Sequence, residues 1–320
     1  GNTIYVVFFE GANTNALNDT VMVGTPNGNT ITFGTPYKLN TLYYNAGASG
    51  AATAPNTALI ELYGYNGSAY VEPIYETTNA GATWTKVEQL EASADTGYSP
   101  YGVFITPLPG TSNGIVQFIQ FYQDSAWNYA IYNGIGVTTG TFGTKTANKD
   151  VNGYGAYTEG NYVYFITPQP GIPDPPYMYI YNATSGTFSS GTEIWPANVN
   201  WVALGGLDNK YLVVFYSNST NQLYYRLMSF AARRWSGPFF VTQNVISQMA
   251  PQYGAGLGKL AGAMMSPSNA LSFFTVPLIG PIPVTFDDNP TTASISVNGN
   301  VQTNGNVVSA CEGGQVFTIN

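Results

Sequence analysis

The segment Thr77-Thr78-Asn79-Ala80-Gly81-Ala82-Thr83-Trp84 contains the side chains that a tight turn between two β-strands requires. Asn79 can hydrogen-bond the backbone of its own turn, and Gly81 can adopt the positive φ that other residues avoid. Trp84 comes directly after the turn, where a large ring can fill the space between two sheets. The run at 70–76 that precedes it is mostly apolar and aromatic, so the segment predicts a hairpin followed by a buried aromatic anchor.

These residues fit the pattern [ST]-x-[DN]-x-G-x-T-W at every specified position. The segment therefore resembles an Asp-box, the turn between the two outer strands of a blade in sialidase-like β-propellers. The resemblance implies a structural role for five residues: Thr77, Asn79, Gly81, Thr83 and Trp84. An ordinary hairpin with a tryptophan after the turn is the alternative interpretation.

A repeat aligned on this turn extends along the chain. Each unit contains apolar strands, a polar Gly or Asn turn and a strand that opens with an aromatic residue. The aromatic anchors are separated by 51, 58, 46 and 47 residues and are Phe33, Trp84, Phe142, Phe188 and Trp235. This spacing is close to the roughly 40 to 50 residues of known propeller repeats. Six such units account for the length of the chain.

The sequence thus predicts an all-β fold, a six-bladed β-propeller that is a single domain over 1–320. The predicted blades cover approximately 1–40, 41–95, 96–148, 149–197, 198–243 and 244–306. The tail at 307–320 is predicted to supply the inner strand that the first blade lacks, which would close the repeat and protect its strand edges. Two β-sandwich domains with a boundary near Asp150 remain the alternative, because turn spacing alone does not separate the two folds.

The composition excludes several kinds of chemistry. The chain of 320 residues has no histidine and one cysteine, Cys311, so Ser-His-Asp and Cys-His nucleophiles, His-ligated metals and an internal disulfide are ruled out. We expect no cofactor and no metal site. Charged residues make up 8% against a typical value of about 25%. With nine basic residues and a net charge of -8, the chain cannot assemble the basic stripe that nucleic acids require.

The same composition predicts an extracellular location. No apolar stretch is long enough to span a membrane, and no signal peptide is recognisable at the N-terminus. Four N-x-[ST] glycosylation acceptors occur, at Asn18, Asn66, Asn182 and Asn218. An absence of histidines and a scarcity of carboxylates leave little to titrate, which predicts tolerance of acid. The composition resembles that of secreted and virion proteins from thermoacidophilic archaea.

The sialidase resemblance does not extend to the catalytic residues. Sialidases bind a substrate carboxylate with three arginines from different blades, whereas Arg226, Arg233 and Arg234 fall within one predicted blade. Glycoside hydrolysis by two carboxylates remains open. The candidates on the predicted loop face are Glu10, Asp95, Asp124, Asp150 and Asp174. Solvated turn residues are the favoured interpretation of these acids.

Aromatic residues near the predicted loops offer platforms for neutral sugars or for another protein. They are Tyr98, Tyr101, Trp127, Trp195, Trp201 and Tyr253, with packing between blades as the structural alternative. We therefore expect a non-catalytic extracellular or virion-surface protein that binds a cell-surface glycan or another surface or virion protein. The alternatives are a secreted, acid-tolerant glycoside hydrolase and a structural subunit of an extracellular filament or surface layer.

Overall fold

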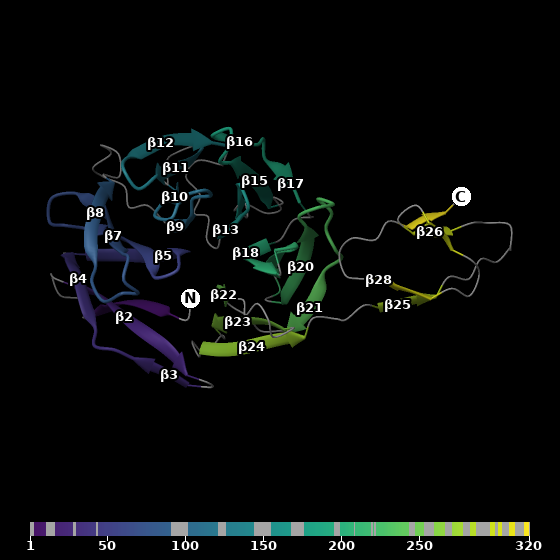
Figure 1. Ribbon diagram of the computed structural model, residues 1–320, viewed down its shortest axis with the longest axis horizontal. Coiled ribbons are helices and arrows are strands. Elements are labelled where there is room, and N and C mark those ends of the chain that lie inside the picture. Colours follow the sequence, from purple (N-terminus) through teal and green to yellow (C-terminus); the bar gives the residue numbers. More distant parts are fainter. Residues whose placement is uncertain are drawn as a thin grey trace. The chain divides into compact units, whose positions relative to one another are not determined.

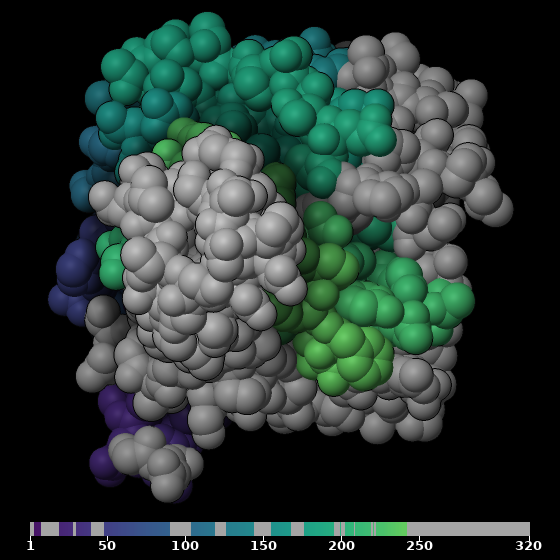
Figure 2. Space-filling model, turned by 90° about the vertical axis from the view of Figure 1, so that its right-hand side faces the viewer, coloured from purple at the N-terminus to yellow at the C-terminus, as the bar shows by residue number. Residues whose placement is uncertain are grey.

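The computed structural model consists of antiparallel strands and turns (Figure 1). The structure describes residues 3–10, 17–27, 30–42, 44–90, 102–120, 126–143, 155–167, 176–194, 199–207, 209–218, 220, 222–242, 247–252, 259–265, 271–277, 282–285, 295–297, 300–302, 307–310 and 317–319. The coloured surface in Figure 2 belongs to described residues. Among the described residues, no helix is long and apolar enough to cross a membrane.

The chain divides into two compact units, 1–197 and 198–320. The first unit contains four antiparallel sheets, which follow one another in chain order from purple to teal in Figure 1. Their strands are β1 (Ile4–Glu10), β2 (Leu17–Asn27), β3 (Thr30–Phe33) and β4 (Tyr37–Leu42); β5 (Tyr44–Ala54), β6 (Thr57–Tyr65), β7 (Tyr70–Thr77) and β8 (Thr85–Leu90); β9 (Gly102–Pro107), β10 (Ile115–Gln120), β11 (Trp127–Tyr132) and β12 (Val137–Phe142); β13 (Gly155–Glu159), β14 (Tyr162–Thr167), β15 (Tyr177–Asn182), β16 (Thr187–Phe188) and β17 (Thr192–Glu193).

The second unit begins with a sheet of the same kind. Its strands are β18 (Val199–Leu207), β19 (Tyr211–Asn218), β20 (Leu223–Ser229) and β21 (Phe239–Thr242). A three-stranded sheet follows, made of β22 (Ser247–Gln252), β23 (Lys259–Met265) and β24 (Leu271–Pro277). Two further small sheets pair β25 (Ile282–Thr285) with β28 (Val307–Ala310), and β26 (Ile295–Val297) with β27 (Asn300–Gln302) and β29 (Phe317–Ile319).

The sheets have the organisation of propeller blades. Consecutive strands pair in an up-and-down order, and in the first unit the inner strand β9 lies beside β5 and β13, the inner strands of the sheets before and after it. In the second unit β18 lies beside β22 in the same way. The predicted fold class, an all-β propeller, is confirmed, and the alternative of two β-sandwiches is not. Five sheets of the described chain have four or five strands and form complete blades, rather than the six predicted.

In the described residues of the C-terminal part, the strand pairing differs from the expected pairing in two respects. The sheet expected as a sixth blade has three strands among the described residues, because β25 leaves it to pair with β28. The tail expected to complete the first blade contributes β28 to that same pair, with Val308 opposite Val284. These two strands are close in sequence, so their pairing closes a much shorter loop than pairing with the N-terminal strands would.

Apolar side chains on the facing surfaces of neighbouring sheets form the core. Between the first two sheets, Val21, Ile60 and Trp84 are buried together, and the Tyr5 ring meets the Trp84 ring edge-on with centroids 5.6 Å apart. Between the third and fourth sheets, Phe118 stacks on Phe165 with centroids 4.2 Å apart. Because strand side chains alternate in direction, each central strand contributes to the clusters on both of its faces.

The turn at 77–84 is held by its own side chains. The Thr83 amide donates to Asn79 Oδ1 at 3.0 Å, Asn79 Nδ2 donates to Thr83 Oγ1 at 2.8 Å, and the Gly81 amide donates to Thr77 Oγ1 at 2.9 Å. Gly81 has a φ of 86°. The turn therefore supplies hydrogen-bond partners for its own backbone and delivers the buried Trp84 into the space between two sheets.

Two equivalent turns use the same chemistry. Asn133 Oδ1 accepts from the amides of Ile135 and Gly136 at 3.0 Å between β11 and β12. Asn182 Oδ1 accepts from the Thr184 amide at 2.9 Å after β15. The glycines of these turns, Gly134 and Gly186, both have positive φ. An Asn followed by a left-handed glycine is thus a repeated device for reversing the chain between outer strands.

Candidate functional site

The carboxylates predicted for hydrolysis lie almost wholly outside the described residues. This applies to Asp95, Asp124, Asp150 and Asp174. Glu10 is the last residue of β1, where it pairs with Asn18 of β2, and its side chain is not described. The structure therefore brings none of these five acids together within its described part.

The predicted aromatic platforms divide in a similar way. Tyr98, Tyr101, Trp195 and Tyr253 lie outside the described residues, and Trp201 belongs to β18 without a described side chain. The prediction that Trp127 is a loop-face binding residue is wrong. Its side chain is 0% exposed and packs edge-on against Phe165, with ring centroids 5.1 Å apart. Trp127 opens β11, a strand whose inward face is covered by the next sheet.

The described glycosylation acceptors lie at strand ends and turns. Asn66 is exposed in the turn after β6, where its Oδ1 accepts from the amides of Ser68 and Ala69 at 2.9 Å. Asn182 ends β15 and Asn218 ends β19, and both are half-buried. Asn218 Nδ2 donates to Gln222 Oε1 at 2.9 Å. Asn18 lies in β2, and its side chain is not described.

A tyrosine–glutamate pair occurs on β13, the inner strand of the fourth sheet. The Tyr157 hydroxyl donates to Glu159 Oε2 at 3.2 Å. Burial, and then the nearby Glu159 carboxylate, raise the pKa of Tyr157 to about 12. A tyrosine that resists ionisation is a poor nucleophile, so the Tyr157 hydroxyl acts here as a hydrogen-bond donor rather than as an activated phenolate.

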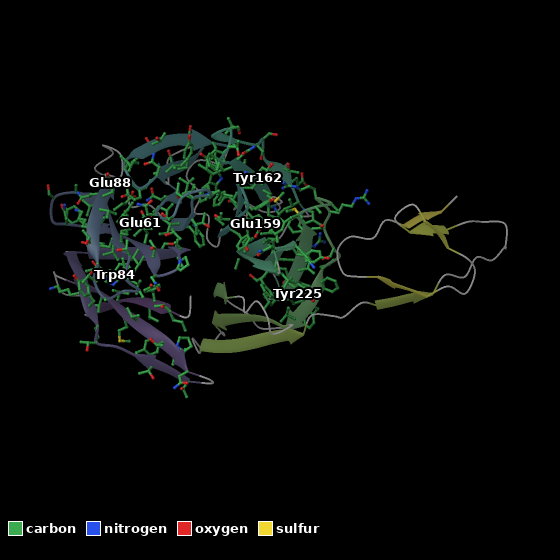
Figure 3. The ribbon with its side chains drawn as sticks, viewed as in Figure 1. Glu61, Trp84, Glu88, Glu159, Tyr162 and Tyr225 are labelled. Atoms are coloured by element: carbon green, nitrogen blue, oxygen red, sulfur yellow. The ribbon has the colours of Figure 1, made fainter. Side chains whose placement is uncertain are left out.

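A group of three buried polar side chains, two of them ionisable, lies between the second and third sheets. Glu61 of β6, Glu72 of β7 and Gln117 of β10 are all buried. Gln117 Nε2 donates to Glu61 Oε1 and also to Glu72 Oε2, the latter at 3.1 Å. Glu61 is labelled in Figure 3, in the second sheet. We call these three residues the carboxyl cluster.

Strand alternation places these residues opposite one another. Glu61 lies two residues after Leu59, and Glu72 lies two residues before Ile74, so each shares a face with an apolar residue of the cluster between the two sheets. Gln117 stands in the same relation to Ile115 on β10. The apolar residues thus fix the spacing of the two sheets, and the polar residues meet in the gap that they define.

The carboxyl cluster is short of hydrogen-bond partners. Glu61 Oε2, Glu72 Oε1 and Gln117 Oε1 are buried and have no hydrogen-bond partner among the described residues. Lys86 is the only basic residue between positions 44 and 142, and its Nζ donates to Gln89 Oε1. An ionised carboxylate buried without a counter-charge is costly, so protonation is the way for this site to reduce its charge.

The electrostatics agree with this expectation. Burial, and then the charge of Glu72, hold the pKa of Glu61 well above its ordinary value of 4.5, against the lowering effect of the Gln117 hydrogen bond. Burial likewise raises the pKa of Glu72 to about 7. The two carboxyls titrate as a pair, so at mildly acidic pH the pair holds at least one proton. The pair can take up and release a proton, and both side chains are buried among the described residues.

Sequence reasoning did not identify the carboxyl cluster. Its signal was present, because Glu61 interrupts the apolar run Leu59-Ile60-Glu61-Leu62, and Glu72 follows Val71 in another buried strand. A glutamate inside a strand that is apolar on both faces must point into a core. The sequence-based prediction placed its catalytic candidates at loop carboxylates instead, because catalytic residues concentrate in loops.

Comparisons with known proteins bear on the fold. No protein-family model and no curated protein matches the chain. Among solved structures, the fungal lectin of Aleuria aurantia, described as a six-bladed β-propeller that recognises fucose, matches with a TM-score of 0.53 at 13% identity, over 86% of this chain and 91% of the lectin. A mutant of that lectin in complex with Fucα1-6GlcNAc matches with a TM-score of 0.52 at 14% identity, over 81% and 86%.

A protein of unknown function from Dyadobacter fermentans is also similar. It matches with a TM-score of 0.58 at 11% identity, over 86% of this chain and 90% of that protein. At these identities the similarity concerns the fold alone. Together with the strand order of the sheets, it shows that the chain has an all-β β-propeller fold.

Proposed function

We propose that this chain is a non-catalytic binding protein that works outside the cell, secreted or on a cell or virion surface, and recognises neutral glycans through its blade loops. The observation that supports the proposal is the similarity in fold to the Aleuria aurantia lectin, whose structures hold fucosides. Because one fold hosts many functions, the chemistry of this chain has to agree with that assignment independently.

The composition suits sugar binding. Neutral sugars are recognised by aromatic faces and by uncharged hydrogen-bonding groups. The chain is 15% aromatic and 8% charged, so its polar surface consists mainly of amides and hydroxyls. The predicted platforms Tyr98, Tyr101, Trp195, Trp201 and Tyr253 supply aromatic faces without a catalytic group.

The carboxyl cluster does not have the arrangement that glycoside hydrolysis requires. A glycosidase needs two carboxyl groups about 5 Å or about 6.5 to 9.5 Å apart with a sugar between them. Glu61 and Glu72 instead share the Gln117 amide inside a closed gap between two sheets. Both side chains are buried, so this pair is not the paired-carboxylate site that a glycosidase needs.

A glycan array with the purified chain tests the proposal, with α-methyl-L-fucoside and Fucα1-6GlcNAc as soluble competitors. We expect binding to a neutral glycan, weakened at least tenfold by Trp201→Ala or Trp195→Ala. Trp127→Phe, which changes a buried ring, is the control and is expected to leave the affinity unchanged. An array without any bound glycan, or release of sugar from the bound ligands, would contradict the proposal.

The extracellular location has its own test. Mass spectrometry of the natural protein is expected to find glycan on Asn66, the acceptor whose side chain is exposed in a turn. A natural protein that is retained inside the cell and carries no glycan at any of the four acceptors would contradict this part of the proposal.

A further inference from the structure

The carboxyl cluster joins two sheets through side chains alone. Gln117 belongs to the third sheet, whereas Glu61 and Glu72 belong to neighbouring strands of the second. The Gln117 amide has two hydrogens, and it donates to one oxygen of each carboxyl group. The other carboxyl oxygens, Glu61 Oε2 and Glu72 Oε1, are buried and accept no hydrogen bond from the part of the chain that the structure describes.

No positive group from the surrounding strands faces this site. Strands β5, β9, β10 and β12 contain no Asp, Glu, Lys or Arg. Besides the apolar residues, the titratable side chains that alternation places on the facing surfaces are acids and tyrosines: Tyr63 and Tyr65 of β6, Tyr70 and Glu76 of β7, Glu88 of β8 and Tyr132 of β11. Glu76 and Glu88 are near enough to raise the pKa of Tyr132, which burial raises first. The surroundings therefore add negative charge and remove none.

We propose that the carboxyl cluster is a proton-dependent latch between the β5–β8 and β9–β12 sheets, closed while the Glu61–Glu72 pair holds a proton and loosened when both carboxyls are ionised. With a proton present, one carboxyl is neutral and Gln117 bridges the pair. When both ionise, two charges share a dry gap with one amide, and separation of the sheet faces lets water reach them. This inference does not rest on the glycan-binding proposal.

The latch makes the propeller tightest in acid. This direction of the pH effect agrees with the electrostatics, because the pKa values of both carboxyls are raised. The pKa of Glu72 is about 7. Above that value, each pH unit makes the ionised, loosened state about tenfold more favourable relative to the closed state. The sheets on either side of the gap, rather than the whole fold, are where the loosening begins, because the strained groups lie between them.

Amide hydrogen exchange on the full chain tests the proposal. Protection factors, referred to the intrinsic exchange rate at each pH, are measured at pH 5 and pH 8 for the amides of β6, β7 and β10. We expect them to fall about tenfold at pH 8, while those of β14 and β15, strands without acidic residues, change less than threefold. An equal fall in β14 and β15 would show general destabilisation and overturn the latch.

Variants separate the cluster from other carboxylates. Glu61→Gln and Glu72→Gln keep the shape and remove the charge, so each is expected to reduce the pH-dependent fall and the double variant to abolish it. Glu193→Gln, which alters an exposed carboxyl on β17, is the matched control and keeps the fall. A fall that persists in the double variant overturns the proposal.

Carbon-13 NMR of the glutamate side chains in the unaltered chain provides a test that needs no variant to fold. The Glu61 and Glu72 carboxyl carbons are expected to titrate well above those of exposed glutamates. Titration of all glutamates together near their ordinary value overturns the proposal. So does restoration of protection at pH 8 by calcium chloride alone, since the oxygens would then serve a cation rather than a proton.

Discussion

Gln117 and Glu61, 56 positions apart in the sequence, meet in the buried gap between the second and third sheets, where the Gln117 amide donates to the Glu61 carboxyl. The same amide also reaches Glu72, so one neutral side chain holds two acids of the neighbouring sheet. The contact depends on the apolar residues beside it, because Leu59 and Ile115 set the separation of the two sheets. Stability, pH dependence and blade packing are thus linked at one place.

The free energy of unfolding is expected to fall as the pH rises. The folded-state pKa of Glu72 is about 7 against an ordinary value of 4.5, so its contribution is fully present below pH 4.5 and is lost as the pH rises through 7. The loss is on the order of 3 kcal/mol. Urea unfolding at pH 4 and pH 8 measures it, and Glu72→Gln should reduce the difference. Equal stability at both pH values would refute the assignment.

Replacement of Gln117 by leucine is expected to destabilise the fold at neutral pH. The variant keeps the side-chain volume roughly constant but leaves both carboxyl groups without their donor. The expected cost is about 3 kcal/mol or more, because unsatisfied buried charged groups cost more than neutral ones. Chemical denaturation at pH 7 measures it. Gln89→Leu on β8, which loses only the contact with Lys86, should cost less than about 1 kcal/mol.

Alanine substitutions at two glycines separate the cost of backbone strain from the cost of lost packing. Gly81 lies in the Thr77–Trp84 turn, and Gly67 lies in the turn after β6. Gly81 has a φ of 86°, and an added Cβ would lie 2.4 Å from Val23 Cγ2 and 3.1 Å from Tyr5. Gly67 has a φ of 99° with nothing within 4 Å of an added Cβ. Gly67→Ala should therefore cost only the strain of about 1 to 2 kcal/mol. Gly81→Ala should cost clearly more, and thermal unfolding compares the two. Equal losses would mean that the first sheet does not pack on this turn.

The side chain of Asn79 should matter for stability as well. Asn79→Ala removes the bonds to the Thr83 amide, to Thr83 Oγ1 and from Thr77 Oγ1. We expect a loss of about 1 to 2 kcal/mol, as for other side chains that cap backbone amides. Asn79→Asp keeps the acceptor and should retain most of the stability. A similar loss in both variants would argue against the acceptor role.

Trp127 provides a test of core against surface. Trp127→Ala is expected to cost about 3 to 5 kcal/mol because it opens a cavity beside Phe165. Phe240→Ala, at a ring that is 53% exposed, should stay within about 0.5 kcal/mol of the unaltered protein. Denaturant titrations of the two variants distinguish these outcomes. A loss of stability from Trp127→Ala well below that range would contradict the buried position of Trp127 and support its role as a surface platform.

Local chemistry in the sequence was enough to predict the all-β class and the turns. Asn79, Gly81 and Trp84 act within a few residues of one another, so their spacing alone predicts a hairpin with a buried anchor. The even separation of Phe33, Trp84 and Phe142 in turn predicts repeated sheets. Trp127 could not be placed in this way, because a strand residue can face either a core or a loop.

Only the tertiary structure decided which distant residues meet. Glu61, Glu72 and Gln117 belong to strands whose own sequences do not specify their partners, and their contact exists because two sheets pack with these faces together. Val308 likewise pairs with Val284, whereas the sequence pattern favoured a pairing of the tail with the first blade. The spacing of the repeat and the residues of a turn are local properties of the sequence. The partner of a sheet face or edge instead depends on the free energies of all competing pairings, and these cannot be read from a single segment.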